Sequence, residues 1–450
     1  TSTRPFRSSA AEPPATGGGV LHRGAYYATS PSYPLEEWFA TTYAEGIVPN
    51  ASRFDLVEGF NPSFVSYSYK SGTDTYTANP DFTEHADGAR LRAICENLSI
   101  DPEAVYLHWD EPTTVTIWPA TPVSYPAGAR VEVYQTSEQS AGIRNAHSFL
   151  PVARPALTEF VRQKAEVVSP GGRKWDGAFL DNCAPVFFNW GGPLVSGGRV
   201  REAGVVVGTT AFNAWHWSNL RDWLVGCRSM LHSLSSPRLL AINAGNVWSD
   251  DFLDLPCVDR VEQEFVGNPV RDIWPPIGEI VRRHKKAASM GVGLWTSAAA
   301  TYFGTPPVTY NEMQYGSLCL HLVVASETSS HHIQDLTGPY RPDWDERVLW
   351  PMESGVMAML GRAIAEPRIE VSGPEVWSRR YEGGVVYARI RQPYYGRTDD
   401  LVWVPAGGTL VSADGSASEV ERVAIKNGGG AIVLSGTPAD AAGFHREDAN

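Results

Sequence analysis

The stretch KWDGAFLDNCAP, residues 174–185, contains a short apolar run that ends on the carboxylate of Asp181. Apolar runs of this length between turn-forming residues are typical of strands buried in a parallel sheet. Along an alternating strand, Asp181 shares a face with Phe179 and Gly177, and the residues between them point to the other face. The fold must therefore be one in which a buried strand delivers an acid to its carboxyl end.

Similar apolar runs recur along the chain, with helix-like stretches between them. We expect strands at residues 22–29, 53–60, 104–109, 176–182, 238–245, 258–265, 291–297 and 320–327. Apolar residues recur at helical spacing in the stretches 155–168, 217–234, 277–290 and 348–364. Repeated alternation of strand and helix predicts a (β/α)8 TIM barrel, in which the carboxyl ends of the strands carry the chemistry.

The pattern changes after about residue 366, where short alternating runs lie between Gly, Asp and Pro turns without a helical period. We therefore expect a C-terminal all-β sandwich, which either packs against the barrel or binds a polymer at a distance from the chemistry. The predicted division is a flexible N-terminal tail (1–20), a catalytic barrel (21–365) and the β-sandwich (366–450). The polar, Pro- and Gly-rich tail resembles a segment left after leader removal, so we expect a secreted or periplasmic protein, with a cytoplasmic one as the alternative.

Composition excludes several classes of partner. The net charge is -13, and the longest cationic run is the five residues 282–286, so a nucleic-acid partner is not expected. The chain contains no stretch of 18 or more apolar residues, so no membrane span is predicted. The five cysteines lack the spacing of a metal site. Aromatic residues make up 11% of the chain, and their faces suit stacking against sugar rings.

Two acids are the candidate catalytic residues. Asp181 follows Asp176 by five positions, and Glu264 follows Asp259 by the same spacing in a later strand, so both terminal acids should reach the same mouth. Two carboxylates across one cleft can hydrolyse a glycosidic bond, because one protonates the leaving oxygen while the other attacks the sugar or activates water. We expect Glu264, beside Phe265, to be the acid or acid/base, and Asp181 the nucleophile or base.

Other residues at the expected strand ends are candidates for binding substrate. They are Tyr26, Glu58, His108, Asp110, Asn182, Asn243, Trp295 and Glu327. Glu58 or Asp110 could replace one member of the catalytic pair, and Trp295 could form a stacking platform. His331, His332 and Asp335 lack helical metal-ligand spacing, so we expect them in a loop and predict neither a metal nor another cofactor.

Two of these strands also resemble a known group of enzymes. WDGAFLDN (175–182) resembles the D-G-(I/V)-F-L-D-N strand of poorly characterised TIM-barrel glycoside hydrolase families, distantly related to the α-galactosidase and α-amylase barrels. VDRVEQEF (258–265) resembles a later strand of these families, although Arg260 stands where glycine is usual. The segments RRYEGGVVYARIR (379–391) and VAIKNGGGAIVLSG (423–436) resemble their C-terminal β-sandwich, with Arg389 where asparagine is common. The resemblance implies that Asp181 and Glu264 are catalytic, and it does not define the sugar.

The sequence therefore predicts a cofactor-independent glycoside hydrolase that acts on a poly- or oligosaccharide. One alternative is a catalytically inactive carbohydrate-binding protein on the same scaffold, because fold does not imply function. Another is a metal-dependent barrel hydrolase, or a lyase that uses Tyr and His, for which His108 or His331 would be essential.

Overall fold

The computed structural model describes most of the chain and divides it into two compact units. The described residues are 20–21, 45–48, 51–76, 85–117, 121–133, 144–185, 187, 198–244, 257–263, 276–299, 310–326, 329–334, 359–373, 375–389, 401–413 and 416–435. The first unit consists of Thr1–Phe6 and Tyr27–Glu262, and the second consists of Arg7–Tyr26 and Gln263–Asn450. No described helix is long and apolar enough to cross a membrane.

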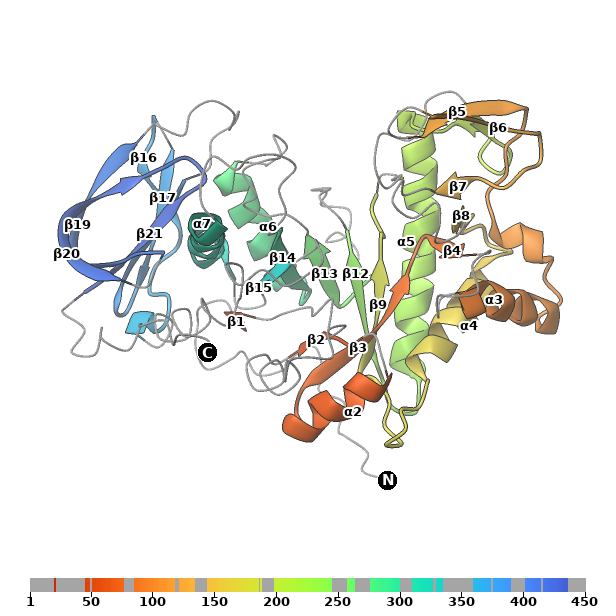
Figure 1. Ribbon diagram of the computed structural model, residues 1–450, viewed down its shortest axis with the longest axis horizontal. Helices are drawn as coiled ribbons and strands as arrows, with labels where there is room; N and C mark the ends of the chain where they lie inside the picture. The colour runs from red at the N-terminus through yellow and green to blue at the C-terminus, as the bar shows by residue number, and fades with distance from the viewer. Residues whose placement is uncertain are drawn as a thin grey trace. The chain divides into compact units, whose positions relative to one another are not determined.

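The first unit contains five parallel strands that are neighbours in one sheet (Figure 1). In spatial order they are β2 (Glu45–Ile47), β3 (Val65–Ser71), β9 (Gly177–Asp181), β12 (Leu239–Asn243) and β13 (Arg260–Gln263), of which β13 ends one residue into the second unit. The connecting helices are α2 (Ala51–Phe60), α4 (Arg154–Ala165) and α5 (Thr210–Ser233). Gly177 opens β9 because a Cβ there would lie 2.6 Å from the Tyr67 ring.

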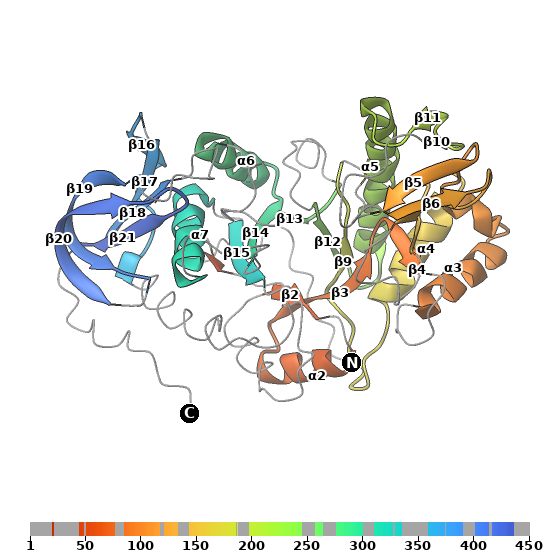
Figure 2. The same ribbon diagram turned by 45° about the horizontal axis from the view of Figure 1, so that its top comes forward.

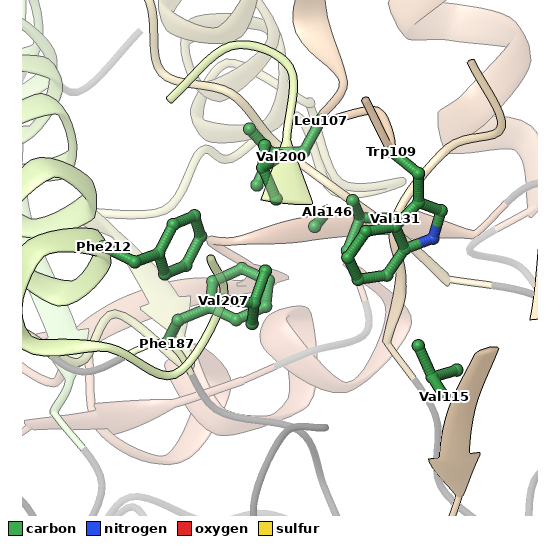
Figure 3. Packing of buried hydrophobic residues seen from close by; sticks show 9 residues of the cluster. All are labelled: Leu107, Trp109, Val115, Val131, Ala146, Phe187, Val200, Val207 and Phe212. Atoms are coloured by element: carbon green, nitrogen blue, oxygen red, sulfur yellow. The ribbon is translucent and has the colours of Figure 1, made fainter. Parts of the chain in front are cut away.

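A long excursion lies between β3 and β9 in the same unit (Figure 2), and a separate hydrophobic cluster forms between it and residues that follow β9. The elements of the excursion are β4 (Asp74–Tyr76), α3 (His85–Asn97), the 3-10 helix η1 (Pro102–Val105), β5 (Thr113–Ile117), β6 (Thr121–Tyr125), β7 (Glu132–Val133) and β8 (Arg144–Ala146). After β9, the hairpin β10 (Arg199–Val200) and β11 (Val205–Val206) adds to the cluster. The buried residues of the cluster are Leu107, Trp109, Val115, Val131, Ala146, Phe187, Val200, Val207 and Phe212 (Figure 3).

The second unit combines three parallel strands with an antiparallel sheet. The parallel strands are β1 (Val20–Leu21), β15 (Ser329–Gln334) and β14 (Gly293–Ala299), accompanied by helices α6 (Ile277–Ser289) and α7 (Tyr310–Val324). The antiparallel sheet has the order β16 (Arg368–Val371), β17 (Val376–Tyr381), β18 (Gly384–Arg389), β21 (Gly430–Leu434), β19 (Val402–Val411) and β20 (Ala417–Ile425).

Helix α7 packs against the antiparallel sheet. The Tyr381 hydroxyl donates to the carbonyl of Leu322 at 2.6 Å, and the Tyr315 hydroxyl accepts from the backbone N–H of Ile432 at 2.9 Å. Tyr315 also donates to the carbonyl of Val411. The C-terminal sheet is therefore joined to the helix that precedes β15 by hydrogen bonds as well as by apolar packing.

The predicted fold class is confirmed: parallel strands and helices of TIM-barrel type precede a C-terminal antiparallel sheet. Four predicted strands coincide with β9, β12, β13 and β14, and the amphipathic stretches that begin at residues 155, 217 and 277 coincide with α4, α5 and α6. The predicted strand 22–29 and most of the stretch 348–364 lie outside the described residues.

Three predicted strands are wrong. Residues 53–60 belong to helix α2, in which Phe54, Val57 and Glu58 are buried at helical spacing. Residues 320–327 contain the end of α7, which is buried over its last ten residues, and a helix buried all round has the same continuous apolar run as a buried strand. The sheet instead contains three strands that were not predicted, β2, β3 and β15, which are short or rich in Ser, Tyr and His.

The third wrong strand, 104–109, lies in the excursion. It consists of the end of η1 followed by isolated bridges, and its apolar residues Leu107 and Trp109 fill the core shown in Figure 3. A run that packs into a small core of its own satisfies the same hydrophobic pattern as a barrel strand, which is why the pattern did not distinguish them.

Candidate active site

The carboxylate of Asp181 is fixed by three hydrogen-bond donors at the carboxyl end of β9. The Tyr69 hydroxyl donates to Oδ2 at 2.7 Å, and Asn243 Nδ2 donates to Oδ1 at 2.8 Å. The backbone N–H of Asn182 also donates to Oδ1, at 2.9 Å. Asp181 is 4% exposed, so these donors set its direction in a site with little water.

The chain leaves β9 through a strained turn that is tied to both neighbouring strands. Asn182 has φ of 63°, a left-handed conformation that is uncommon for a residue other than glycine. Gly72 N donates to the Asp181 carbonyl at 2.7 Å, and Cys183 N donates to the Asn243 carbonyl at 2.8 Å. A Cβ at Gly72 would lie 2.3 Å from Cys183 Sγ, so only glycine permits this approach.

The strand register sets a second carboxylate, that of Glu262, level with Asp181. Leu180 is paired with Ile242, so Asp181 and Asn243 follow at the same height, and Asn243 is paired with Glu262 on β13. Side chains at one height of a parallel sheet point to the same face. Asn243 is 1% exposed and Glu262 is fully buried.

Sequence reasoning missed Glu262 because it looked only at the last acid of the run. Glu262 lies within β13, and Glu264 directly follows the last residue of that strand in the sequence. The two-residue offset between the strands, which barrel stagger requires, sets Glu262 level with Asp181. Glu264 itself lies outside the described residues.

An ion pair lies nearer the amino ends of the strands than Asp181 and Glu262. Arg260 Nε bonds Glu45 Oε1 at 3.2 Å, and the Tyr67 hydroxyl donates to Glu45 Oε2 at 2.9 Å. Burial and the charge of Glu45 raise the pKa of Tyr67. Burial lowers the pKa of Arg260, but the charge and hydrogen bond of Glu45 and the charges of Tyr67 and Asp259 together outweigh this and raise it. Arg260 is therefore a half-buried, charged support beneath the site.

Asp176 and Asp259, the acids directly before β9 and β13, each tie their strand to a neighbouring strand. Asp176 Oδ2 accepts from Ser66 N at 2.9 Å, and Asp259 Oδ2 accepts from Leu240 N at 2.8 Å. Each aspartate also donates its own backbone N–H to the carbonyl of the same partner, at 2.9 Å for Asp176 and 2.8 Å for Asp259. These reciprocal contacts assign both residues to holding the sheet together at the amino ends of the strands.

Glu58, His108 and Asp110 do not lie at strand ends, contrary to prediction. Glu58 is in helix α2, 3% exposed, and pairs with Arg173 at 2.5 Å. His108 and Asp110 belong to the excursion, where the apolar run 104–109 was wrongly predicted to be a barrel strand. His108 Nδ1 lies 2.8 Å from Glu202 Oε1, and Asp110 N donates to the carbonyl of Arg199 at 2.9 Å.

The remaining predicted residues divide between the second unit and undescribed parts of the chain. Trp295 is the third of seven residues of β14 and 2% exposed, so it is a core residue within the strand and does not end it. His331 and His332 lie in β15, where a loop was expected. Tyr26 and Glu327 lie outside the described residues. Within the described ranges no group of three or more His, Cys, Asp or Glu is arranged to hold a metal ion.

Several solved structures have a similar arrangement of elements. The trehalose-6-phosphate hydrolase of Bacillus licheniformis is 10% identical with a TM-score of 0.45, and 89% of this chain and 93% of that chain are covered. A family GH13_31 enzyme is 9% identical with a TM-score of 0.44, and the coverage is 88% and 92%. An alpha-N-acetylgalactosaminidase of Bifidobacterium bifidum, solved as a GalNAc complex, is 12% identical with a TM-score of 0.38, and the coverage is 83% and 55%.

Comparisons at the level of sequence find nothing: no protein-family model and no curated protein matches the chain. The roles of individual residues therefore depend on the geometry described above.

Proposed function

We propose that the protein is a glycoside hydrolase in which Asp181 is the nucleophile or base. The observation that carries this proposal is the carboxylate of Asp181, nearly buried and held by Tyr69, Asn243 and the Asn182 N–H at the carboxyl end of a parallel strand. Carboxylates in this position carry the chemistry of β/α barrels, and an oriented carboxylate suits attack on an anomeric carbon or on water.

The surroundings of Asp181 also suit a substrate rich in hydroxyl groups. Asn182 Nδ2 is buried without a hydrogen-bond partner among the described residues. An amide donor left in this state costs about 1–3 kcal/mol, which a hydroxyl of a bound sugar would recover. A poly- or oligosaccharide therefore satisfies both the carboxylate chemistry and the unpaired donor, and it needs no cofactor.

The second carboxylate comes from β13 in this proposal. Glu264 is the acid predicted from the sequence, because it directly follows the end of the strand. Glu262 is the second candidate, because the register sets it level with Asp181 on the same face. Two strand spacings separate the Cα atoms of Asp181 and Glu262 by roughly 10 Å. Side chains converging on the barrel axis would bring the carboxyl groups within the range of about 5 to 9.5 Å that glycosidases use.

The test is product release from a panel of plant and microbial glycans by three matched variants. Asp181→Asn should lower turnover by about 10² to 10⁴-fold while the urea unfolding curve is retained. Glu264→Gln and Glu262→Gln identify the partner, since only the variant that removes the acid should show a loss of the same size. Turnover by Asp181→Asn close to that of the wild type would refute the proposal.

A catalytically inactive sugar-binding protein is the competing function, and the same panel separates the two. Affinity for a glycan without any released product, measured with the wild-type chain, would favour the binding protein. If activity is found, its persistence in a chelating buffer would disfavour the metal-dependent alternative.

A further inference from the structure

The outer face of strands β19 and β20 exposes a large aromatic side chain. Along β19 the burial alternates, with Val404 and Ala406 in the core of the sheet and Trp403 and Pro405 in solvent. Trp403 is 52% exposed, and Leu401 before the strand is 44% exposed. Tryptophan is highly buried on average in folded proteins, so a half-exposed indole beside the β-bulge that follows Pro405 is a candidate for contact with a ligand.

Cations from β20 lie on the same face. Arg422 is paired with Pro405, and its guanidinium lies 4.6 Å from the centroid of the Trp403 ring. Ala424 is paired with Trp403, and exposed Lys426 follows the strand opposite Leu401. The Trp403 patch is defined by Leu401, Trp403, Pro405, Arg422, Ala424 and Lys426.

The charge of the Trp403 patch is opposite to that of the whole chain. Its six residues include two cations and no carboxylate, in a protein of net charge -13. The neighbouring Glu419 is engaged elsewhere, because it accepts from the Thr409 hydroxyl at 2.7 Å. A ligand that matches this patch combines a face that can stack on indole with a negative group that can bind guanidinium.

We propose that the Trp403 patch binds an acidic polysaccharide, one whose sugar residues carry carboxylates. The C–H face of a sugar ring would stack on the indole, and a carboxylate of the same or the next residue would form a charge-assisted hydrogen bond with Arg422. Trp403 and Arg422 are both exposed, and the residues paired with them, Ala424 and Pro405, have small side chains. Such a site is independent of the catalytic proposal, because it requires only the C-terminal sheet.

The experiment measures binding of the full chain to several uronate polysaccharides, among them polygalacturonate and alginate. Each polymer is paired with its methyl-esterified or carboxyl-reduced form, and affinity electrophoresis supplies the dissociation constants. We expect binding to at least one acidic polymer, weaker binding to its neutral form, and a decrease with salt because the ionic contacts are screened.

Three variants test the residues of the patch. Trp403→Ala should weaken binding by about tenfold or more, equivalent to about 1.4 kcal/mol. Arg422→Gln should abolish the preference for the acidic over the neutral form. Ile369→Ala, which alters a 50% exposed residue of β16 in the same sheet, is the control and should bind as the wild type does.

Absence of binding to every acidic polymer, or equal binding of acidic and neutral forms, would overturn the proposal. Unchanged binding by Trp403→Ala would do the same. Turnover by Asp181→Asn reports only on the catalytic proposal, so failure of one proposal can be distinguished from failure of the other.

Discussion

Strand β9 has an aspartate at each end, Asp176 directly before it and Asp181 as its last residue, and the two have different surroundings. At the amino end, Asp176 exchanges backbone and side-chain hydrogen bonds with Ser66 of β3. At the carboxyl end, Asp181 accepts from Tyr69, Asn243 and the Asn182 N–H and is followed by a strained turn. The comparison indicates that one end of the sheet is built for stability and the other for holding a carboxylate in one direction.

The largest loss of stability should come from substituting Asp259, the acid directly before β13. Its side chain is fully buried and bonds Arg228, His232 and Leu240 N at 2.8 to 2.9 Å. Asp259→Ala leaves these partners unsatisfied and should destabilise the protein by roughly 3–5 kcal/mol in urea unfolding. Asp181→Asn is the matched control and should change stability by about 1 kcal/mol or less. Equal losses would contradict the division between the two ends.

The contribution of Asp259 should also depend on pH. Burial raises its pKa, but hydrogen bonds from His232 and Leu240 and the charge of Arg228 outweigh this, so its pKa lies below the ordinary value. The stabilisation is therefore fully present above the unfolded pKa of about 3.9, and is lost as pH falls through the lower folded value. The stability gap between wild type and Asp259→Asn should be wide at pH 7 and narrower at pH 3. A gap that does not change would rule out the ionised form as its source.

A smaller loss is expected at Gly177, at the start of β9. An added Cβ would lie 2.6 Å from the Tyr67 ring and 2.7 Å from the Leu239 carbonyl, so Gly177→Ala should cost about 1–3 kcal/mol. Gly226 in helix α5 has no atom within 4 Å of an added Cβ, and Gly226→Ala should stabilise by about 0.5–1 kcal/mol. Thermal unfolding of both variants measures the difference, and a neutral Gly177→Ala would contradict the tight packing.

The smallest expected loss of stability comes from Tyr→Phe substitutions at two tyrosines of β3. Tyr69 bonds Asp181 and Tyr67 bonds Glu45, one layer apart on the same strand. Each Tyr→Phe variant should lose about 1 kcal/mol of stability. Only Tyr69→Phe should also lower turnover, by about tenfold, because it releases one oxygen of the carboxylate. Equal turnover in the two variants would show that the Tyr69 contact does not position Asp181.

Much of the fold follows from local pattern, and the failures have physical causes. The apolar runs of β9, β12, β13 and β14 are flanked by turns and amphipathic helices, so their period and position predict them. Helix α7 was missed because it is buried between other elements and so lacks an amphipathic period. The strand predicted at residues 104–109 was wrong because Trp109 and its neighbours pack into a separate core. A one-dimensional pattern does not distinguish such a core from that of a barrel.

The amino-acid sequence by itself determined that the chain alternates strands with helices, that an all-β segment follows, and that Asp181 ends a buried strand. Period and turn chemistry are local properties, so they can be read one segment at a time. Only the tertiary structure decided that Asp176 and Asp259 are structural, that Glu262 stands level with Asp181, and that Trp403 is exposed beside Arg422. Each of these depends on the register between strands, which long-range hydrogen bonds set and which no stretch of sequence contains.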